Sequence, residues 1–336
     1  MKNKKLIGYC FTRSLGDMTA EDIRVLDGVN IAFGLIKNGE VYWKEKNGKR
    51  DIARIKEINP KLKIVLSVGG WAADGFSQAA ETQEGRAKFA ESAARLTEEY
   101  GFDGIDIDWE YPCSDKAGIR AIPGDKENFT LMLKALRGRL DAFTEYKILS
   151  IATGALGFYV EHTQMKEVAD ILDYVQLMTY DLYGEWDSVT GHHAGLYSGA
   201  GEGPSSDAAV RLFVSAGVPY EKLVMGAAFY SREWKGVRNS KPGSPAEKGG
   251  QTHSYDTIVK YLETGEKNYT KMWDDEAKAA YLYNGNQFVS YEDERALQYK
   301  AEYVKEKNMY GMMYWEYGLD KTCSLTRLIR KQLDES

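Results

Sequence analysis

A row of carboxyl side chains between residues 102 and 110 is the part of this sequence that points most directly to chemistry. The segment reads Phe102-Asp103-Gly104-Ile105-Asp106-Ile107-Asp108-Trp109-Glu110. Side chains of a strand alternate between its two faces, so Asp106, Asp108 and Glu110 share one face and the apolar residues between them share the other. Burying three carboxylates in one row costs several kcal/mol unless protons, donors or metals compensate. The pattern therefore predicts a functional site.

Eight short apolar runs, separated by amphipathic stretches, are the elements that must position this row. They are Leu6–Phe11, Asn30–Ile36, Lys63–Val68, Gly104–Trp109, Tyr146–Ala152, Tyr174–Tyr180, Leu223–Tyr230 and Tyr310–Tyr317. Near-continuous hydrophobicity is typical of parallel strands that are covered on both sides. Eight strand–helix units predict an α/β protein with a (β/α)8 TIM barrel. A doubly wound open sheet is the alternative, and no Gly-rich dinucleotide fingerprint supports it.

In such a barrel the apolar face of the acidic strand packs against the helices, and the acids point inward. Glu110 then lies at the carboxyl end of the strand, where barrel active sites form. A half-exposed strand with a solvated acidic face is one alternative, and a divalent metal site is another. Same-face neighbours stand about 6.6 Å apart at Cα, and no second set of acidic ligands accompanies them. We therefore expect no metal here or at His192 and His193, which lack a third ligand.

The interval from Tyr230 to Tyr310 is longer than the other gaps between strands. It contains a Gly/Pro/Ser-rich stretch at 236–250 and several aromatic residues. We predict an inserted α+β subdomain at 233–291, followed by a barrel helix at 293–308. Residues 1–232 and 292–336 would then form the catalytic barrel.

The acidic row also resembles a known signature. Asp103-x-x-Asp106-x-Asp108-x-Glu110 is similar to the catalytic motif of glycoside hydrolase family 18, the chitinases and their relatives. Three further segments resemble the family's motifs in the expected order: Ser67–Trp71, Met178–Asp181 and Tyr310–Tyr317. The insertion resembles the family's chitinase insertion domain. Together these matches span nearly the whole chain.

The resemblance implies substrate-assisted, retaining hydrolysis of glycosidic bonds without a cofactor or metal. Glu110 would be the general acid, and the 2-acetamido group of the substrate would be the nucleophile. Asp108 would orient that group, Asp106 and Asp108 would share a proton, and Tyr180 would donate its hydroxyl to the acetamido carbonyl.

The resemblance further implies a set of residues that bind the sugar chain: Met178, Asp181, Tyr230, Arg232, Trp315, Tyr9, Phe33, Gly70, Trp71 and Tyr111. Trp315 would be the floor on which the sugar at the cleavage point stacks. Ala228 and Ser231 stand where the family commonly has Pro and Gly, so detail near Tyr230 and Arg232 is expected to differ. Asp103, Ser67 and Gly69 are expected to support the acids from below.

Composition limits the remaining function classes. The 336 residues carry 43% hydrophobic and 28% charged side chains and a formal net charge of -6, which argues against a nucleic-acid partner. No stretch reaches the roughly 18 apolar residues of a membrane span. Cys10, Cys113 and Cys323 lack metal-ligand spacing and are expected to be structural thiols.

We therefore expect a monomer whose partner is chitin or a chitooligosaccharide. The N-terminal residues 1–5 are basic, but the apolar run that follows is short for a signal peptide. The sequence thus predicts a cytoplasmic protein, or a secreted one if a leader has been removed. An endo-β-N-acetylglucosaminidase, a peptidoglycan-directed glycosidase and a non-catalytic chitin-binding lectin are the alternative functions.

Overall fold

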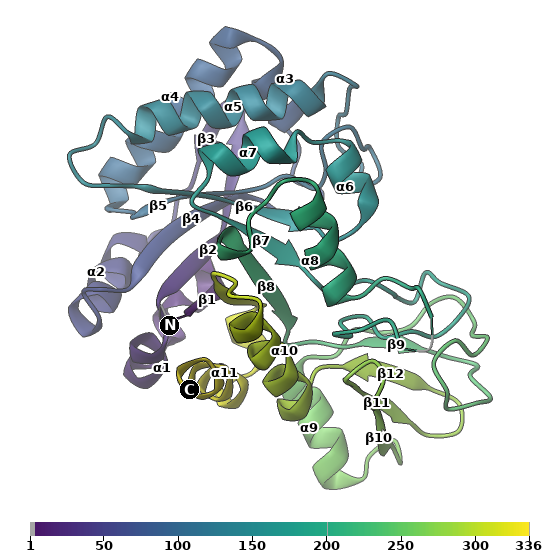
Figure 1. The fold of residues 1–336 in the computed structure, drawn as a ribbon. Coiled ribbons are helices and arrows are strands. Elements are labelled where there is room, and N and C mark those ends of the chain that lie inside the picture. Colours follow the sequence, from purple (N-terminus) through teal and green to yellow (C-terminus); the bar gives the residue numbers. More distant parts are fainter. Residues whose placement is uncertain (1–3, 200, 336) are drawn as a thin grey trace.

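A closed parallel barrel forms the centre of the molecule. The computed structural model describes residues 4–199 and 201–335, so residues 1–3 of the basic N-terminal segment lie outside the described part. Within these ranges, eight parallel strands close into a ring in which β1 pairs with both β2 and β13 (Figure 1). In order around the ring they are β1 (Lys5–Phe11), β13 (Gly311–Trp315), β8 (Leu223–Ala228), β7 (Tyr174–Met178), β6 (Ile148–Gly154), β5 (Gly104–Asp108), β4 (Lys63–Gly69) and β2 (Gly28–Lys37).

Helices surround this ring, as Figure 1 shows. The α-helices of the barrel are α1 (Ala20–Val25), α2 (Gly48–Ile58), α3 (Phe76–Glu81), α4 (Gln83–Tyr100), α5 (Asp125–Leu140), α6 (Gly157–Glu161), α7 (Met165–Ile171), α8 (Ser206–Ser215), α10 (Glu294–Glu306) and α11 (Ser324–Asp334). Short 3-10 helices lie at Thr12–Asp17, Tyr220–Lys222 and Tyr317–Leu319. The predicted (β/α)8 barrel is confirmed, and each predicted strand overlaps an observed one. No helix in the described ranges is both long and apolar enough to cross a membrane.

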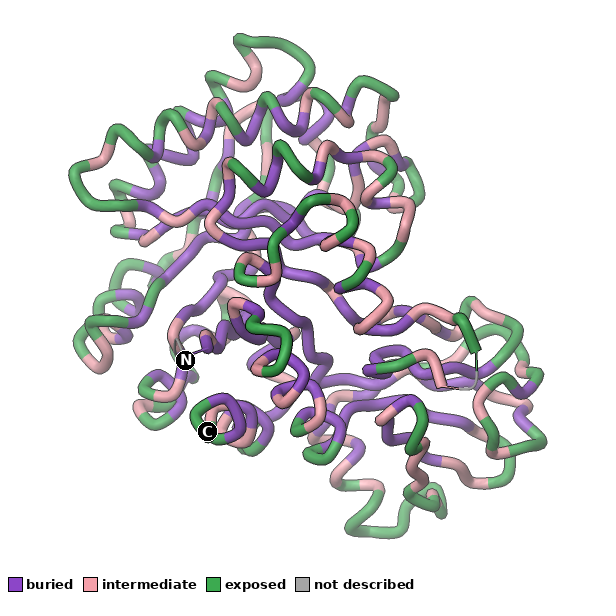
Figure 2. Tube along the Cα trace, viewed as in Figure 1, coloured by how far each residue is buried: buried purple, intermediate pink, exposed green. Residues whose placement is uncertain are grey.

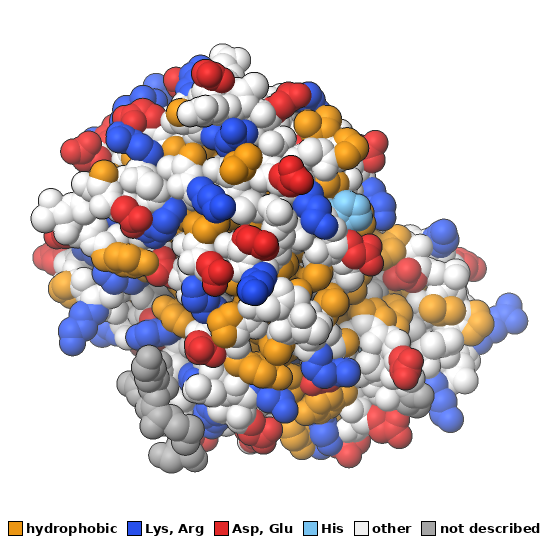
Figure 3. Space-filling view, turned by 45° about the horizontal axis from the view of Figure 1, so that its top comes forward, with side chains coloured by type: hydrophobic (Ala, Val, Ile, Leu, Met, Phe, Trp, Pro, Cys, Tyr) orange, Lys and Arg blue, Asp and Glu red, His pale blue; other side chains and the backbone are white. Residues whose placement is uncertain are grey.

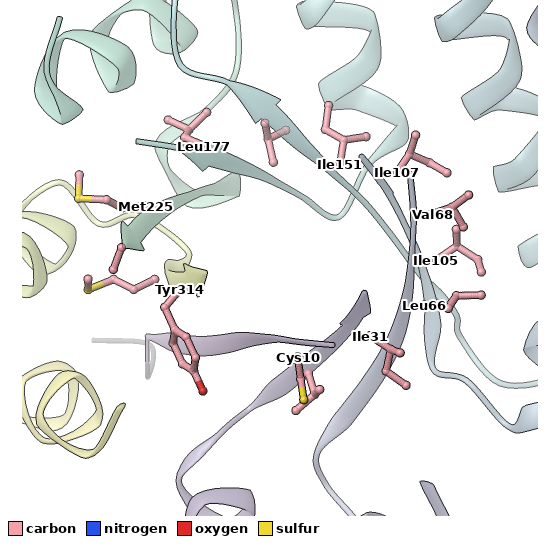
Figure 4. Close-up of a cluster of buried hydrophobic side chains, with 14 of the residues drawn as sticks. Cys10, Ile31, Leu66, Val68, Ile105, Ile107, Ile151, Leu177, Met225 and Tyr314 are labelled. Atoms are coloured by element: carbon pink, nitrogen blue, oxygen red, sulfur yellow. The ribbon is translucent and has the colours of Figure 1, made fainter. Parts of the chain in front are cut away.

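The main core lies between the strands and the helices. Figure 4 shows Ile105 and Ile107 of β5 on the same side of the sheet as Leu66 and Val68 of β4. All four are fully buried in the main hydrophobic cluster. In Figure 2 the barrel strands are buried along most of their length, whereas the surrounding helices alternate between buried and exposed positions. The apolar face of β5 therefore packs outward, as its alternation predicts.

A second, antiparallel sheet lies between β8 and β13 in the sequence. It consists of β10 (Thr270–Asp274), β11 (Ala279–Tyr283), β12 (Phe288–Tyr291) and β9 (Arg232–Trp234), with α9 (Tyr255–Thr264) beside it. A short strand β3 (Glu40–Tyr42) pairs with the end of β2. Trp234, Phe288, Tyr281 and Val237 form the small core of the second sheet. Strand β9 begins one residue before the predicted boundary, and the domain limits themselves stay a prediction.

The loop from β7 to α8 is joined to this second sheet by backbone hydrogen bonds. Gly249 N–H donates to the Glu185 carbonyl at 2.7 Å, and Tyr197 N–H donates to the Ala277 carbonyl at 3.1 Å. His193 N–H donates to Ser290 Oγ at 2.9 Å. The loop that follows β7 and the inserted segment therefore form one continuous wall beside the barrel mouth.

Candidate active site

Asp106 is the centre of a hydrogen-bond network inside the barrel. Strand register places Ser67 of β4 and Ser150 of β6 on either side of it. Each serine hydroxyl donates to the carboxylate at 2.7 Å. Tyr9 Oη donates to Asp106 Oδ2 at 2.8 Å, and Gln176 Nε2 donates to Oδ1 at 2.9 Å. Burial raises the pKa of Asp106, and these four donors oppose that rise by stabilising the anion.

Asp108, two residues further along β5, lacks such partners. Its side chain is buried, and Oδ1 has no hydrogen-bond partner among the described residues. Burial, followed by the negative charges of Glu110 and Asp106, holds its pKa well above the usual range. The sharing of a proton between Asp106 and Asp108 remains a prediction. Of the two carboxyl groups, Asp108 has the more strongly raised pKa and therefore holds a proton more readily.

Gly69 and Gly70 allow the backbone to pass close to these acids. Gly69 has φ of +125°, and a Cβ on it would stand 2.0 Å from the Asp108 carbonyl oxygen. Gly70 has φ of +94°, and a Cβ on it would stand 2.6 Å from the Phe33 ring. Both positions exclude a side chain, because L residues rarely adopt such φ values and the space is already filled.

Glu110 follows the end of β5 at the mouth of the barrel. Burial raises its pKa to about 7; Tyr111 acts against this rise and the charge of Asp181 acts with it. A carboxyl group with a pKa near 7 is matched to donating a proton at neutral pH. Tyr111 packs edge-on against Tyr159 and Trp71, and the rings of Tyr111 and Tyr159 line the same pocket as the acid.

Tyr180 and Asp181 approach the acids from the end of β7. Tyr180 is buried, and its hydroxyl lies 3.9 Å from Met313 Sδ, a weak acceptor. The hydroxyl is therefore free to donate to a stronger acceptor. Asp181 adopts φ of +55° and accepts two hydrogen bonds of 2.7 Å from Arg232 Nε and Nη2. Burial alone would raise the pKa of Asp181, but neighbouring His193 and Arg232 hold it well below its usual range.

Arg232 is engaged with protein groups. Besides its two bonds to Asp181, its Nη1 donates to Glu185 Oε1 at 3.1 Å. The guanidinium also lies 4.9 Å from the ring centroid of Trp186 and 5.5 Å from that of Tyr230. These contacts fix the orientation of Asp181, and direct binding of sugar by Arg232 stays a prediction.

Aromatic rings from three strands gather on the other side of the mouth. Trp315, at the end of β13, has Tyr9, Phe11 and Phe33 at ring-centroid distances of 5.6, 5.3 and 5.6 Å. The Trp315 and Phe33 rings are stacked at 21°. Such a half-buried indole supplies a flat apolar surface of the kind that stacks on a sugar ring. Trp71 and Trp186 are 62% and 48% exposed, which leaves their rings open to a ligand.

The structure thus brings most of the predicted site residues to one end of the barrel. Asp103 is the exception, because it lies at the opposite, amino end of β5. There it accepts hydrogen bonds from Ile64 N–H at 2.8 Å and from Lys56 Nζ at 2.5 Å. These hydrogen bonds tie the start of β5 to α2 and β4, at the opposite end of the strand from Glu110.

Gln176 is a site residue that the sequence did not single out, and His193, which the sequence raised only as a possible metal ligand, is another. Gln176 is fully buried and joins Tyr9, Asp106 and Asn30 in one network. A polar residue inside the otherwise apolar run Tyr174–Met178 was the signal that could have identified it. His193 is fully buried, and its Nδ1 lies 3.8 Å from Asp181 Oδ1. Its neighbour His192 pairs with Asp274 at 3.0 Å.

The described part of the chain contains no candidate metal site. There, no group of three or more His, Cys, Asp or Glu side chains is arranged to hold a metal ion. On the face shown in Figure 3, acidic and basic side chains alternate rather than gather by sign. Cys10, Cys113 and Cys323 are free thiols, and two of them are buried.

A closed (β/α)8 barrel with a protonatable carboxyl group and aromatic platforms at its mouth defines an enzyme of the glycoside hydrolase class. The chain matches the family described as "Glycosyl hydrolases family 18" over residues 5–320. It belongs to this family, and the resemblance drawn from the acidic strand is confirmed.

Two relatives of this chain are named chitinases. Chitinase A1 of Niallia circulans is 36% identical over 307 residues, which cover 83% of this chain and 44% of that protein. Chitinase B of Serratia marcescens is 29% identical, with 94% of this chain and 81% of that protein covered. This chain therefore spans less than half the length of the first relative.

A solved structure resembles the whole chain. It is a family 18 N-acetylglucosaminidase from Paenibacillus barengoltzii, with 43% sequence identity and a TM-score of 0.94. The match covers 98% of this chain and all of that one. The barrel and the inserted sheet described above are thus present together in a relative of the same size.

Proposed function

We propose that this chain hydrolyses β-1,4-linked N-acetylglucosamine chains with retention of configuration. The observation that carries the proposal is the unpartnered carboxyl oxygen of Asp108 beside Glu110. A buried acceptor without a donor is unfavourable in the free protein. The N–H of a 2-acetamido group would supply the missing donor. Membership of a family with chitinase-named relatives supports the same substrate class.

The proposed reaction has two steps. Glu110 donates its proton to the glycosidic oxygen, and the bond from that oxygen to the anomeric carbon breaks. The acetamido carbonyl oxygen attacks the anomeric carbon from the opposite side, assisted by the Tyr180 hydroxyl, and forms an oxazolinium ion. Water then attacks the same carbon while Glu110 accepts its proton, and the acetamido group is regenerated. Two inversions give net retention.

The test is hydrolysis of N-acetylated chitooligosaccharides, glycopeptides and peptidoglycan fragments in parallel. Product size is read by mass spectrometry, and the first anomer formed is read by NMR. We expect chitooligosaccharides to be cleaved with the β-anomer appearing first. Initial α-anomers would contradict the mechanism. Preferential cleavage of glycopeptides or peptidoglycan would show that one of these, rather than an N-acetylglucosamine chain, is the substrate. Binding of oligosaccharide without any cleavage would favour the lectin alternative.

A second candidate is stepwise release of single N-acetylglucosamine units. The solved relative that matches the full length of this chain is described as an N-acetylglucosaminidase. The time course with a hexamer distinguishes the two candidates. Monomer as the first product indicates stepwise release, whereas dimers or larger products from the outset indicate a chitinase pattern.

A further inference from the structure

A buried ion pair lies between α10 and the carboxyl ends of β7 and β8. Lys300 of α10 and Glu292, which follows β12, have side chains that are 1% and 2% exposed, and Nζ lies 2.8 Å from Oε1. Helix α10 packs against β8 and β13 outside the ring of strands (Figure 1). Burial lowers the pKa of Lys300, and Glu292 opposes this fall. Replacing a buried ion pair by uncharged residues is often neutral for stability, so stability alone does not explain this one.

The ion pair is bound to the main chain of both strands. Lys300 Nζ donates to the Gly226 carbonyl of β8 at 3.0 Å and to the Thr179 carbonyl, just after β7, at 3.5 Å. Together with Glu292 Oε1, three oxygens therefore surround an ammonium group that has three N–H bonds. The other oxygen of Glu292 accepts the Ala228 N–H of β8 at 2.7 Å. The pair thus holds two backbone groups of β8 and the carbonyl that follows β7.

These contacts lie where the regular pairing of β7 with β8 has ended. The last register pair is Leu177 with Met225. Beyond it, the Thr179 side chain bridges the two strands, because its Oγ1 donates to the Gly226 carbonyl at 2.7 Å and accepts the Gly226 N–H at 3.0 Å. The separation of the two chains at this level is therefore set by side chains, and Lys300 binds a carbonyl on each of them.

Tyr180 is the site residue that depends on this arrangement. Its backbone directly follows the Thr179 carbonyl, and its ring packs against Gly226, where an added Cβ would stand 3.0 Å from Tyr180 Cε1. The only hydrogen-bond acceptor of the Tyr180 hydroxyl among the described residues is a thioether sulfur at 3.9 Å, so no strong hydrogen bond fixes the ring. Lys300 does not line the pocket that Tyr180 lines. It holds the backbone on either side of the ring from outside the site.

We propose that Lys300, paired with Glu292, is a positioning residue that sets where the Tyr180 hydroxyl stands during the reaction. The inference rests on the proposed function, in which this hydroxyl assists attack by the acetamido carbonyl. Such assistance depends on geometry, since a displacement of about 1 Å can lower a rate about 100-fold. Lys300 acts through the backbone carbonyls of Thr179 and Gly226 and does not touch the substrate.

The experiment compares kcat on an N-acetylated chitooligosaccharide in four forms of the enzyme. They are the wild type, the paired replacement Lys300→Met/Glu292→Gln, Tyr180→Phe, and the paired replacement combined with Tyr180→Phe. Replacing both charges leaves no unpaired charge in the interior, and the glutamine keeps an acceptor for the Ala228 N–H. Rates are expressed per folded molecule, with the folded fraction read by circular dichroism.

We expect the paired replacement to lower kcat about tenfold to 100-fold when Tyr180 is present, with a smaller change in KM. In the Tyr180→Phe background it should lower kcat by less than about twofold, because no hydroxyl remains to be positioned. If the paired replacement does not fold, Glu292→Gln alone, which keeps Lys300, is compared in the same two backgrounds. Its expected loss is about twofold to tenfold with Tyr180 and none without it.

The matched control is Lys147→Met. Lys147 is also a buried lysine that donates to a backbone carbonyl, that of Phe102 at 3.1 Å, but it lies just before β6 at the amino end of the barrel. Its replacement should leave kcat per folded molecule unchanged, both with Tyr180 and with Tyr180→Phe.

An active wild type whose kcat is unchanged by the replacements at Lys300 and Glu292 would overturn the role of the ion pair and leave the proposed function intact. An equal loss in the Tyr180 and Tyr180→Phe backgrounds would also overturn it, because the pair would then not act through Tyr180. A loss of the same size in Lys147→Met would do so too, since any buried lysine would have this effect. Failure of the wild type to cleave the oligosaccharide, or a wild-type rate in Tyr180→Phe, would instead contradict the proposed reaction, and the inference with it.

Discussion

The two ends of strand β5 carry the same residue type in opposite circumstances. At the amino end, the Asp103 side chain is partly exposed and lies within 3.3 Å of two lysine ammonium groups and a backbone N–H. At the carboxyl end, Asp108 is buried, forms no ion pair with any described residue, and keeps one oxygen without a hydrogen-bond partner. A strand needs only the first kind of carboxylate for stability. Under the proposed function, the substrate supplies the hydrogen-bond donor that the second kind lacks in the free protein.

The largest loss of activity among substitutions that compare the two ends of β5 is expected at Glu110. Glu110→Gln should lower kcat by about 10²- to 10⁴-fold, because the amide cannot donate the proton that the leaving oxygen requires. Binding of chitooligosaccharide should remain measurable by calorimetry. Asp115→Asn, an exposed acid in the following loop, is the matched control and should keep its rate. A near-normal rate in Glu110→Gln would show that another group is the acid.

A smaller loss of activity is expected from Asp108→Asn, together with an unusual stability result. Turnover should fall about 100-fold, since the amide orients the acetamido group poorly and offers it no negative charge. The free energy of unfolding at neutral pH should be unchanged or higher, because the substitution replaces a buried ionisable group that has no partner with a neutral amide. Chemical denaturation measures the second quantity. A clear loss of stability would mean that Asp108 serves the fold after all.

The pH dependence tests the same end of β5. Because Glu110 must be protonated to act, kcat/KM should fall about tenfold per pH unit above about pH 7. Its pKa is raised from 4.5 in the fold, so its contribution to stability is fully present below pH 4.5 and is lost as the pH rises to about 7. Glu110→Gln should abolish this part of the pH dependence of unfolding. A rate profile that stays flat to pH 9 would contradict the raised pKa.

The smallest effect is expected at the amino end. Asp103→Asn should lower the free energy of unfolding by about 1 kcal/mol, because two partly exposed ion pairs are lost while the hydrogen bond from Ile64 N–H persists. Activity per folded molecule should not change. If kcat falls as it does in Asp108→Asn, the two ends of the strand are not separate in function and the comparison fails.

Local patterns explain why so much of the scaffold could be predicted. Helix α4 begins and ends where its sequence indicates, since Thr82 accepts a hydrogen bond from Gly85 N–H at its start and Gly101 adopts φ of +70° at its end. The outward apolar face of β5 follows from alternation alone. These signals lie within a few residues of one another, so no knowledge of distant strands is required.

The partners of the acids could not be predicted in the same way. Gln176 of β7 contacts Asp106 of β5 past the intervening strand β6, and the two residues are 70 positions apart in the sequence. The pairing of Asp181 with Arg232 likewise depends on how the loop after β7 meets β9. Such contacts are set by closure of the ring and by the path of the insertion. Polar residues in otherwise apolar strands indicate that such contacts exist. A single sequence does not show which of these residues contact one another.

The backbone hydrogen bonds between the β7–α8 loop and the inserted sheet make the insertion an unsuitable unit for deletion or exchange. Glu185, which holds Arg232 through its side chain, accepts the Gly249 N–H through its carbonyl. A shortened chain that joined β8 directly to α10 would keep every barrel strand, yet the segment carrying Asp181 would lose its neighbours. Recombination between relatives should therefore exchange this loop and the inserted sheet together.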